Sequence, residues 1–133
     1  MKMKWMGLLL PVVVSGSAVG AETPKATPEL LAKGKTAYTT NCQSCHGEKG
    51  EGNGPAGTYL VPKPRNFVAE TFKKGSKPEE IFKTLTTGIP GSTMVPFAHL
   101  PEQDRWALTH YVLELQKQGK ADAKGKKKDA AKK

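Results

Sequence analysis

The 133-residue sequence predicts an all-α fold of three to five short helices joined by long loops. Three segments carry apolar residues at helical spacing behind recognisable start signals, and no segment shows the strict apolar and polar alternation typical of a strand. Five glycines in the eleven residues from Gly47 to Gly57 argue against regular structure between the first two of these segments. We therefore expect a loop there whose backbone can approach a flat group closely.

The first predicted helix begins after Thr27, a favourable N-cap, with Pro28 and Glu29 in its first turn. Its inward face is expected to carry Leu30, Leu31, Gly34, Ala37 and Tyr38.

The second helix is predicted to follow a capping box over residues 76–79 and to end at Gly88. Its inward residues are Ile81, Phe82 and Leu85. The third helix is predicted to begin near Pro101 and to end at about Gln116. Its apolar surface comprises Trp106, Leu108, Tyr111, Val112 and Leu115.

Between the first two helices lies the segment Cys42-Gln43-Ser44-Cys45-His46, and C-x-x-C-H is the pattern that attaches a haem covalently. Two thiols on one helical turn can each form a thioether with the same porphyrin, and the following imidazole then lies over the iron. Cys42 and Cys45 are the only cysteines in the chain. We therefore predict one haem c, attached through Cys42 and Cys45, with His46 as an iron ligand.

Other uses of the two cysteines are less favoured. A thioredoxin-like redox pair needs a βαβ context, which the flanking segments do not provide. A structural zinc site needs four ligands, usually with a second pair at short spacing, whereas His99 and His110 are separated by ten residues. A Cys42–Cys45 disulfide would close a very small loop, for which the entropic stabilisation is smallest.

Met94 is the predicted sixth ligand of the iron. The other three methionines lie in the first six residues, which belong to a predicted leader, and Met94 lies on a loop bounded by glycine and proline. A single methionine is often a core filler, but fillers usually lie on a helix face. Methionine and histidine ligation is usual for electron-carrying haems of this kind.

His99 and His110 are the competing sixth ligands. The loop that carries His99 is restricted by Pro96 and Pro101, so we expect this side chain to face solvent. His110 falls within the last predicted helix, where a hydrogen-bonded or surface histidine is the simpler interpretation.

The N-terminus resembles a secretory signal peptide. Lys2 and Lys4 precede an apolar run of about ten residues, and small residues then lead to Ala21, after which we expect cleavage. The run is well short of the ~20 residues that span a bilayer, so a retained membrane anchor is the less favoured alternative. We expect residues 1–21 to be removed on export and the protein to be periplasmic.

The remaining chain is predicted to form one monohaem domain over residues 22–118 and a disordered, lysine-rich tail over residues 119–133. Residues 117–133 carry eight lysines and two aspartates, a net charge of +6, whereas residues 22–116 carry eleven basic and ten acidic residues, a net charge of +1. The tail either directs the protein to an acidic partner or an anionic membrane surface, or merely keeps it soluble.

The order of these motifs resembles the small class I cytochromes c of bacteria, and it is similar to the monohaem domains related to the diheme subunit of cbb3-type oxidases. The resemblance covers residues 27–116. It rests on Gly34 and Tyr38, on Cys42 to Gly47, on Gly52 to Pro55, on Pro62 to Phe67, on Gly88 to Phe97, and on Trp106 to Val112.

The resemblance implies the class I cytochrome c fold, with the helices and long loops wrapped around one covalent haem. Cys42 and Cys45 would form the thioethers, and His46 and Met94 would be the axial ligands. The resemblance implies two further contacts. The backbone carbonyl of Pro55 would accept a hydrogen bond from His46, and Arg65 would bind a haem propionate unless it is simply a solvated loop cation.

The expected function is periplasmic electron transfer without catalysis, because two filled axial positions leave no coordination site for a substrate. We expect a monomer that meets redox proteins with acidic docking surfaces, binds no nucleic acid and touches membranes only peripherally. Two alternatives stay open. One is a haem enzyme or gas sensor in which Met94 is labile, and the other is an electron-entry subunit of a larger oxidoreductase.

Overall fold

A computed structural model describes residues 22–131, so the predicted leader lies outside the described residues. Over this range the chain is helical, with no strand, which confirms the predicted all-α class. The elements are α1 (Pro28–Asn41), α2 (Gln43–His46), the 3-10 helix η1 (Gly57–Tyr59), α3 (Pro78–Thr87) and α4 (Glu102–Ala130).

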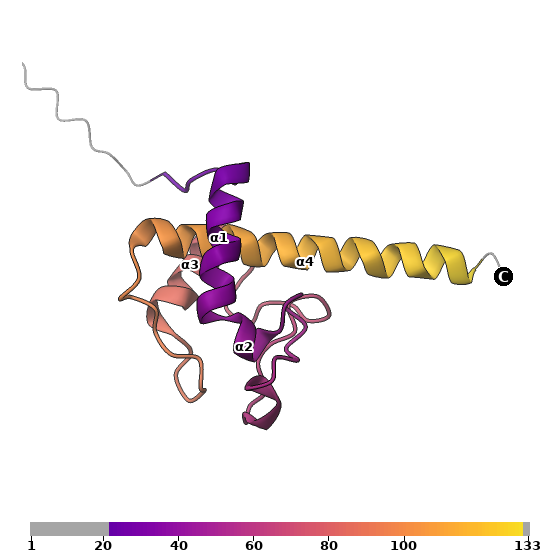
Figure 1. Ribbon diagram of the computed structural model, residues 1–133, viewed down its shortest axis with the longest axis horizontal. Coiled ribbons are helices and arrows are strands. Elements are labelled where there is room, and N and C mark those ends of the chain that lie inside the picture. The colour runs from indigo at the N-terminus through magenta and orange to yellow at the C-terminus, as the bar shows by residue number, and fades with distance from the viewer. Residues whose placement is uncertain (1–21, 132–133) are drawn as a thin grey trace, which may run out of the picture.

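Helix α1 lies across α4, and this crossing organises the fold (Figure 1). Thr27 caps α1 as predicted, because its hydroxyl accepts a hydrogen bond from the backbone N–H of Leu30 at 3.2 Å. Gly34 faces the backbone of Ala107 so closely that a Cβ atom would overlap the carbonyl group there. A glycine at this position therefore lets the two helix backbones meet.

Helix α3 packs against α4 beside this crossing. Its N-cap is Lys77, one residue later than the capping box over residues 76–79 would place it, and the carboxylate of Glu80 accepts from the backbone N–H of Lys77 at 2.9 Å. The shift follows from Pro78, which favours the first helical position because it has no N–H to leave unpaired. Gly88 ends the helix as predicted.

The core lies where α1, α3 and α4 meet the loop around Phe67. Tyr38 and Leu108 are almost fully buried there, and the rings of Tyr38 and Tyr111 lie 5.3 Å apart. The buried cluster consists of Tyr38, Cys42, Phe67, Ile81, Leu85, Leu108, Val112 and Leu115. Cys42 belongs to this cluster, so one cysteine of the C-x-x-C-H motif is part of the hydrophobic core.

Residues 22–27 are bound to the domain. The ring Nε2 of the buried His110 donates to the backbone carbonyl of Pro24 at 2.7 Å, and the hydroxyl of Thr23 donates to the carboxylate of Glu79. This contact agrees with the expectation that His110 is a hydrogen-bonded histidine of the last helix.

Helix α4 differs most from the sequence prediction. It continues to Ala130, through most of the segment from Gly119 to Lys133 that we expected to be disordered. Every residue from Lys120 to Ala131 is exposed, so no tertiary contact holds this part of the helix. Lysine and alanine are good helix formers, and they extend a helix whose first half is already formed by packing. Among the described residues, no helix is long and apolar enough to span a membrane.

Candidate functional site

An apolar cavity of about 320 Å³ brings the predicted site residues together. Cys42, Cys45 and His46 line it from the α2 region, and Met94 lines it from the loop after α3. Its apolar walls include Leu60, Phe67, Phe72, Ile81, Leu85, Ile89, Val95, Phe97 and Val112. Four residues that are up to 52 positions apart in the chain therefore share one apolar chamber.

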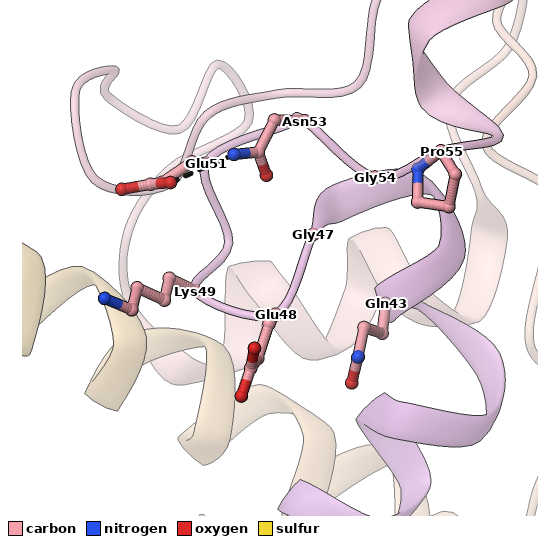
Figure 2. Close-up of a pocket in the computed structure, with 8 residues that line it drawn as sticks. All are labelled: Gln43, Gly47, Glu48, Lys49, Glu51, Asn53, Gly54 and Pro55. Carbon is pink, nitrogen blue, oxygen red and sulfur yellow. Dashed lines mark hydrogen bonds between the residues drawn. The ribbon is translucent and has the colours of Figure 1, made fainter.

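The glycine-rich segment after His46 holds the motif from outside this cavity. Its backbone N–H groups satisfy carbonyls at the end of α2: Gly52 donates to His46 at 2.8 Å and Ala56 donates to Ser44 at 2.9 Å. The side chains of this segment border a separate polar depression that is open to solvent (Figure 2). The segment therefore binds to α2 on the side away from the cavity, whereas we expected it to lie along the haem face.

His46 is oriented by two contacts. Its Nδ1 donates to the backbone carbonyl of Arg65 at 3.2 Å, and its ring stacks on Phe67 with centroids 4.5 Å apart. With the proton on Nδ1, the lone pair of Nε2 is available for a metal. Burial lowers the pKa of His46, against an opposing effect of the hydrogen bond to Arg65, and so favours the neutral ring that metal ligation requires.

Met94 is held by the folding of its loop back onto the end of α3. Gly88 has φ +68°, which favours glycine, and a Cβ atom at this position would lie only 2.7 Å from the backbone carbonyl oxygen of Met94. That carbonyl accepts from Ile89 at 3.1 Å, and the backbone N–H of Met94 donates to the hydroxyl of Ser92 at 3.1 Å. These contacts place the half-buried methionine side chain in the cavity wall.

A family model for cytochrome c matches residues 31–116. This chain belongs to the cytochrome c family. The matched span contains both motif cysteines, His46 and Met94, which are the residues that the cavity brings together. Membership implies a covalently bound haem c and a role in electron transfer. The predicted class I cytochrome fold is confirmed as well.

One solved structure similar to this cytochrome is a chain of the Kuenenia stuttgartiensis reducing HAO-like protein complex Kustc0457/Kustc0458. The two chains share 35% sequence identity with a TM-score of 0.63. The match covers 71% of this cytochrome and 44% of that chain, so the cytochrome spans less than half of its structural relative. No curated protein matches the sequence.

The donor groups of this cytochrome fit a haem c. The cavity supplies two unpaired thiols, one imidazole and one thioether within mostly apolar walls, which suit the hydrophobic faces of a porphyrin. Burial, with a smaller effect of the neighbouring Cys45, raises the pKa of the Cys42 thiol to about 12. A thiol with so high a pKa differs from the acidic thiols of thioredoxin-like proteins.

The structure does not show the expected role of Pro55. Its side chain is exposed and lines the polar depression of Figure 2, outside the apolar cavity. The acceptor for His46 is instead the carbonyl of Arg65. The hydrogen bond from the N–H of Ala56 to the carbonyl of Ser44 holds the segment around Pro55 against the outer side of α2. The residue that bonds to the ring of His46 is Arg65, ten residues later in the chain.

The side chain of Arg65 has partners within its own loop. Its guanidinium donates to the carboxylate of Glu70 at 2.7 Å and to the backbone carbonyl of Thr71 at 2.8 Å. Both bonds use Nη1, and the contact of the guanidinium with a haem propionate stays a prediction. Arg65 still lines the cavity, and it contributes to the site through its backbone carbonyl.

Three lysines of the cavity wall were missed by sequence reasoning. Lys63, Lys73 and Lys74 line the cavity and are also exposed, so they place positive charge where the chamber meets solvent. Such charges complement the carboxylates of a haem. No local motif marks these lysines, because only the folding of residues 60–75 over the cavity brings them together.

The rim of the cavity also carries exposed apolar side chains. Val95 lines the cavity and is 57% exposed, and Tyr59 and Val61 flank the lining residue Leu60 with most of their surface in solvent. An apolar rim with lysines nearby is suited to brief contact with another protein.

His99 and His110, the competing ligands, are both outside the cavity lining. His99 is exposed beside Phe97, as expected, with ring centroids 5.8 Å apart.

Proposed function

We propose that this cytochrome carries single electrons through one haem held by His46 and Met94. Cys42 and Cys45 form the two thioether links, and when bound the haem supplies the one-electron couple between ferrous and ferric iron. The observation that carries the proposal is the single apolar cavity lined by all four of these side chains.

The residues of the chain have distinct tasks in this proposal. The Arg65 carbonyl fixes the tautomer and plane of His46, because it accepts the Nδ1 proton. The loop that begins at Gly88 presents the thioether of Met94. The apolar walls exclude water, so the surroundings reorganise little when the charge changes. Lys63, Lys73 and Lys74 would balance the negative charge of the haem carboxylates.

We further propose that the protein is a carrier and has no catalytic activity of its own. With an imidazole and a thioether as axial ligands, no position is left for dioxygen, peroxide or another substrate. The exposed apolar side chains of Tyr59, Val61 and Val95 support the same proposal, because a partner protein could bind to them near the cavity.

We propose export to the periplasm after cleavage at Ala21. The support from the described residues is that the segment after this position already contacts the domain: Thr23 bonds to Glu79 and Pro24 to His110. N-terminal sequencing of the protein purified from a periplasmic extract tests the proposal. An N-terminus at Glu22 is expected, and an intact residue 1 would contradict export with cleavage.

A second candidate role is that of an electron-entry subunit within a larger oxidoreductase. The observation that favours it is the similar chain of 35% identity, which belongs to a protein complex and is more than twice as long as the matched part. Native mass measurement of the protein from its own cells separates the two roles. A mass of one chain with one haem supports the free carrier, and a stable larger assembly supports the subunit.

An optical spectrum with a redox titration tests the proposed ligation. We expect a reversible one-electron couple, the weak far-red band of a methionine-ligated ferric haem, and no binding of carbon monoxide by the reduced protein. Ready binding of carbon monoxide would instead indicate a labile Met94 and a haem enzyme or gas sensor.

A further inference from the structure

The exposed part of α4 carries most of its lysines on one side. Beyond Gly119, which packs against Val68, the helix projects from the domain as a single rod (Figure 1). Successive lysines at spacings of three and four residues share one helix face, here within an arc of about 100°. We call this the lysine face, and it consists of Lys117, Lys120, Lys124, Lys127 and Lys128.

The opposite side of the same segment is nearly neutral. Lys126 lies there, with Asp122 four residues before it and Asp129 three residues after it, and both spacings place the carboxylates beside this lysine. One lysine against two aspartates gives this side a net charge of −1. The extension is therefore charged on one side, which a disordered tail of the same composition would not be.

The chemistry of the lysine face favours an acidic protein over a membrane. Alanine is the only apolar residue from Lys120 to Ala131, whereas helices that bind lipid surfaces present a broad apolar side with large aliphatic or aromatic residues. The charge is also concentrated here, because residues 22–116 have a net charge of only +1. The face spans about 16 Å, which matches a row of carboxylates along a protein surface.

We propose that the lysine face docks along an acidic surface of the protein that exchanges electrons with this cytochrome. The proposal rests on the function proposed above and names the chemistry of the partner. Val112, about 18 Å before Lys124 on the same helix, lines the haem cavity. Because the helix is continuous, a partner bound to the lysine face is held in a set orientation relative to the cavity.

Two single substitutions separate a docking face from a general effect of charge. Lys124→Glu alters the lysine face, and Lys126→Glu makes the same change in net charge on the opposite side. Both sites are exposed, so both full-length proteins should fold and carry haem equally. The probe is a synthetic helical peptide with glutamates at positions i, i+3, i+4 and i+7 of one face, titrated at low salt and followed by calorimetry.

We expect Lys124→Glu to weaken peptide binding about fivefold more than Lys126→Glu, as the loss of an exposed ion pair predicts. Ala123→Pro, which breaks the helix without a change in charge, should abolish the difference between the two sites when combined with each substitution. Equal weakening by both single substitutions would overturn the proposal, because net charge alone would then explain the binding.

Vesicles of phosphatidylcholine and phosphatidylglycerol in a three-to-one mixture provide the competing surface. Tighter binding to these vesicles than to the acidic peptide, with the same preference for Lys124, would overturn the proposal in favour of a membrane. Binding is measured without electron transfer, so its outcome is independent of the redox titration. A parent protein without a reversible couple would refute the proposed function, whereas a failed peptide contrast would refute only the docking face.

Discussion

The two halves of helix α4 belong to one continuous helix but have different surroundings. In the first half, Ala107, Leu108 and Thr109 have no measurable exposure, and α1 and α3 both pack against them. In the second half, every side chain from Lys120 to Ala131 is exposed. The first half is therefore held by burial of apolar surface, and the second half depends on intrinsic helix propensity.

This difference shows how a cofactor site and an exposed charged surface can share one element. A short isolated helix is marginal in water because its first turn is costly to form. The packed half of α4 supplies that first turn, so residues after Gly119 need only to extend it. We expect changes around the cavity to affect the whole fold and changes in the extension to affect only the extension.

The largest expected effect follows from removal of both thioether cysteines. In Cys42→Ala/Cys45→Ala, the haem is no longer attached and the apolar cavity loses the group that would fill it, so the packed half of α4 should lose most of its helicity. Haem staining of a denaturing gel and circular dichroism measure the two effects. Ser44→Ala, at an exposed position between the cysteines, is the control and should keep both signals. Full helicity without haem would contradict the idea that the cofactor completes the core.

Substitutions in the two halves of α4 compare them directly. Leu108→Ala should lower the free energy of unfolding by about 2–5 kcal/mol, because it leaves a cavity in the packed half. Lys120→Ala should change it by less than about 0.5 kcal/mol, because that side chain makes no buried contact. Denaturant unfolding of the haem-loaded proteins gives both values. Similar losses at the two sites would show that the extension is packed after all.

Met94→Ala tests the cavity without disturbing α4. Covalent haem should be retained, the reduction potential should fall by on the order of 0.1 V, and the reduced protein should bind carbon monoxide, because a thioether favours ferrous iron over its replacement by water. His99→Ala, at an exposed position outside the cavity lining, is the control. An unchanged spectrum and potential in Met94→Ala would assign the sixth position to another residue, first of all His99.

Tyr38→Phe tests the contact between α1 and the haem motif. The buried hydroxyl donates to the Gly47 carbonyl at 2.7 Å, so its loss should cost about 1 kcal/mol of unfolding free energy at neutral pH. Burial, and to a lesser extent the nearby Cys42 and Tyr111, raises the pKa of Tyr38 above its ordinary value of 10.0.

As the pH rises, the unfolded chain loses the Tyr38 proton at a lower pH than the folded protein does, so the folded state becomes less stable relative to the unfolded state. The stability that this group contributes is present below about pH 10 and declines as the pH rises above that value. Unfolding free energies of parent and Tyr38→Phe should therefore stay apart up to about pH 10 and converge as the pH rises above that value. Curves that stay parallel across this range would show that Tyr38 does not titrate differently in the two states.

The smallest effect on the folded domain is expected from deletion of residues 119–133. The haem spectrum and the unfolding free energy should hardly change, because from Lys120 onward the described side chains are exposed. The rate of electron exchange with an acidic redox protein should fall at low salt and match that of the intact protein at high salt, where the Debye length is short. Equal rates for both forms at every salt concentration would leave solubility as the role of the extension.

Much of the site was determined by the sequence alone. The spacing of Cys42, Cys45 and His46 is a local property of one helical turn, and it specifies haem attachment wherever the segment folds. Met94 was also found from the sequence, because it is the only methionine after the predicted leader and lies on a constrained loop. The start of α1 followed from the capping signal of Thr27, and the start of α4 near Pro101 was predicted from the sequence as well.

The tertiary structure alone decided which groups surround these residues. The carbonyl that accepts from His46 belongs to Arg65 rather than Pro55, and the guanidinium of Arg65 turns to Glu70. The reason is that a backbone carbonyl carries no side-chain signal, and its direction depends on how a loop of some twenty residues closes over the motif. The helical extension of α4 was decided in the same way: its composition resembles that of a disordered tail, and only attachment to a packed helix allows it to continue.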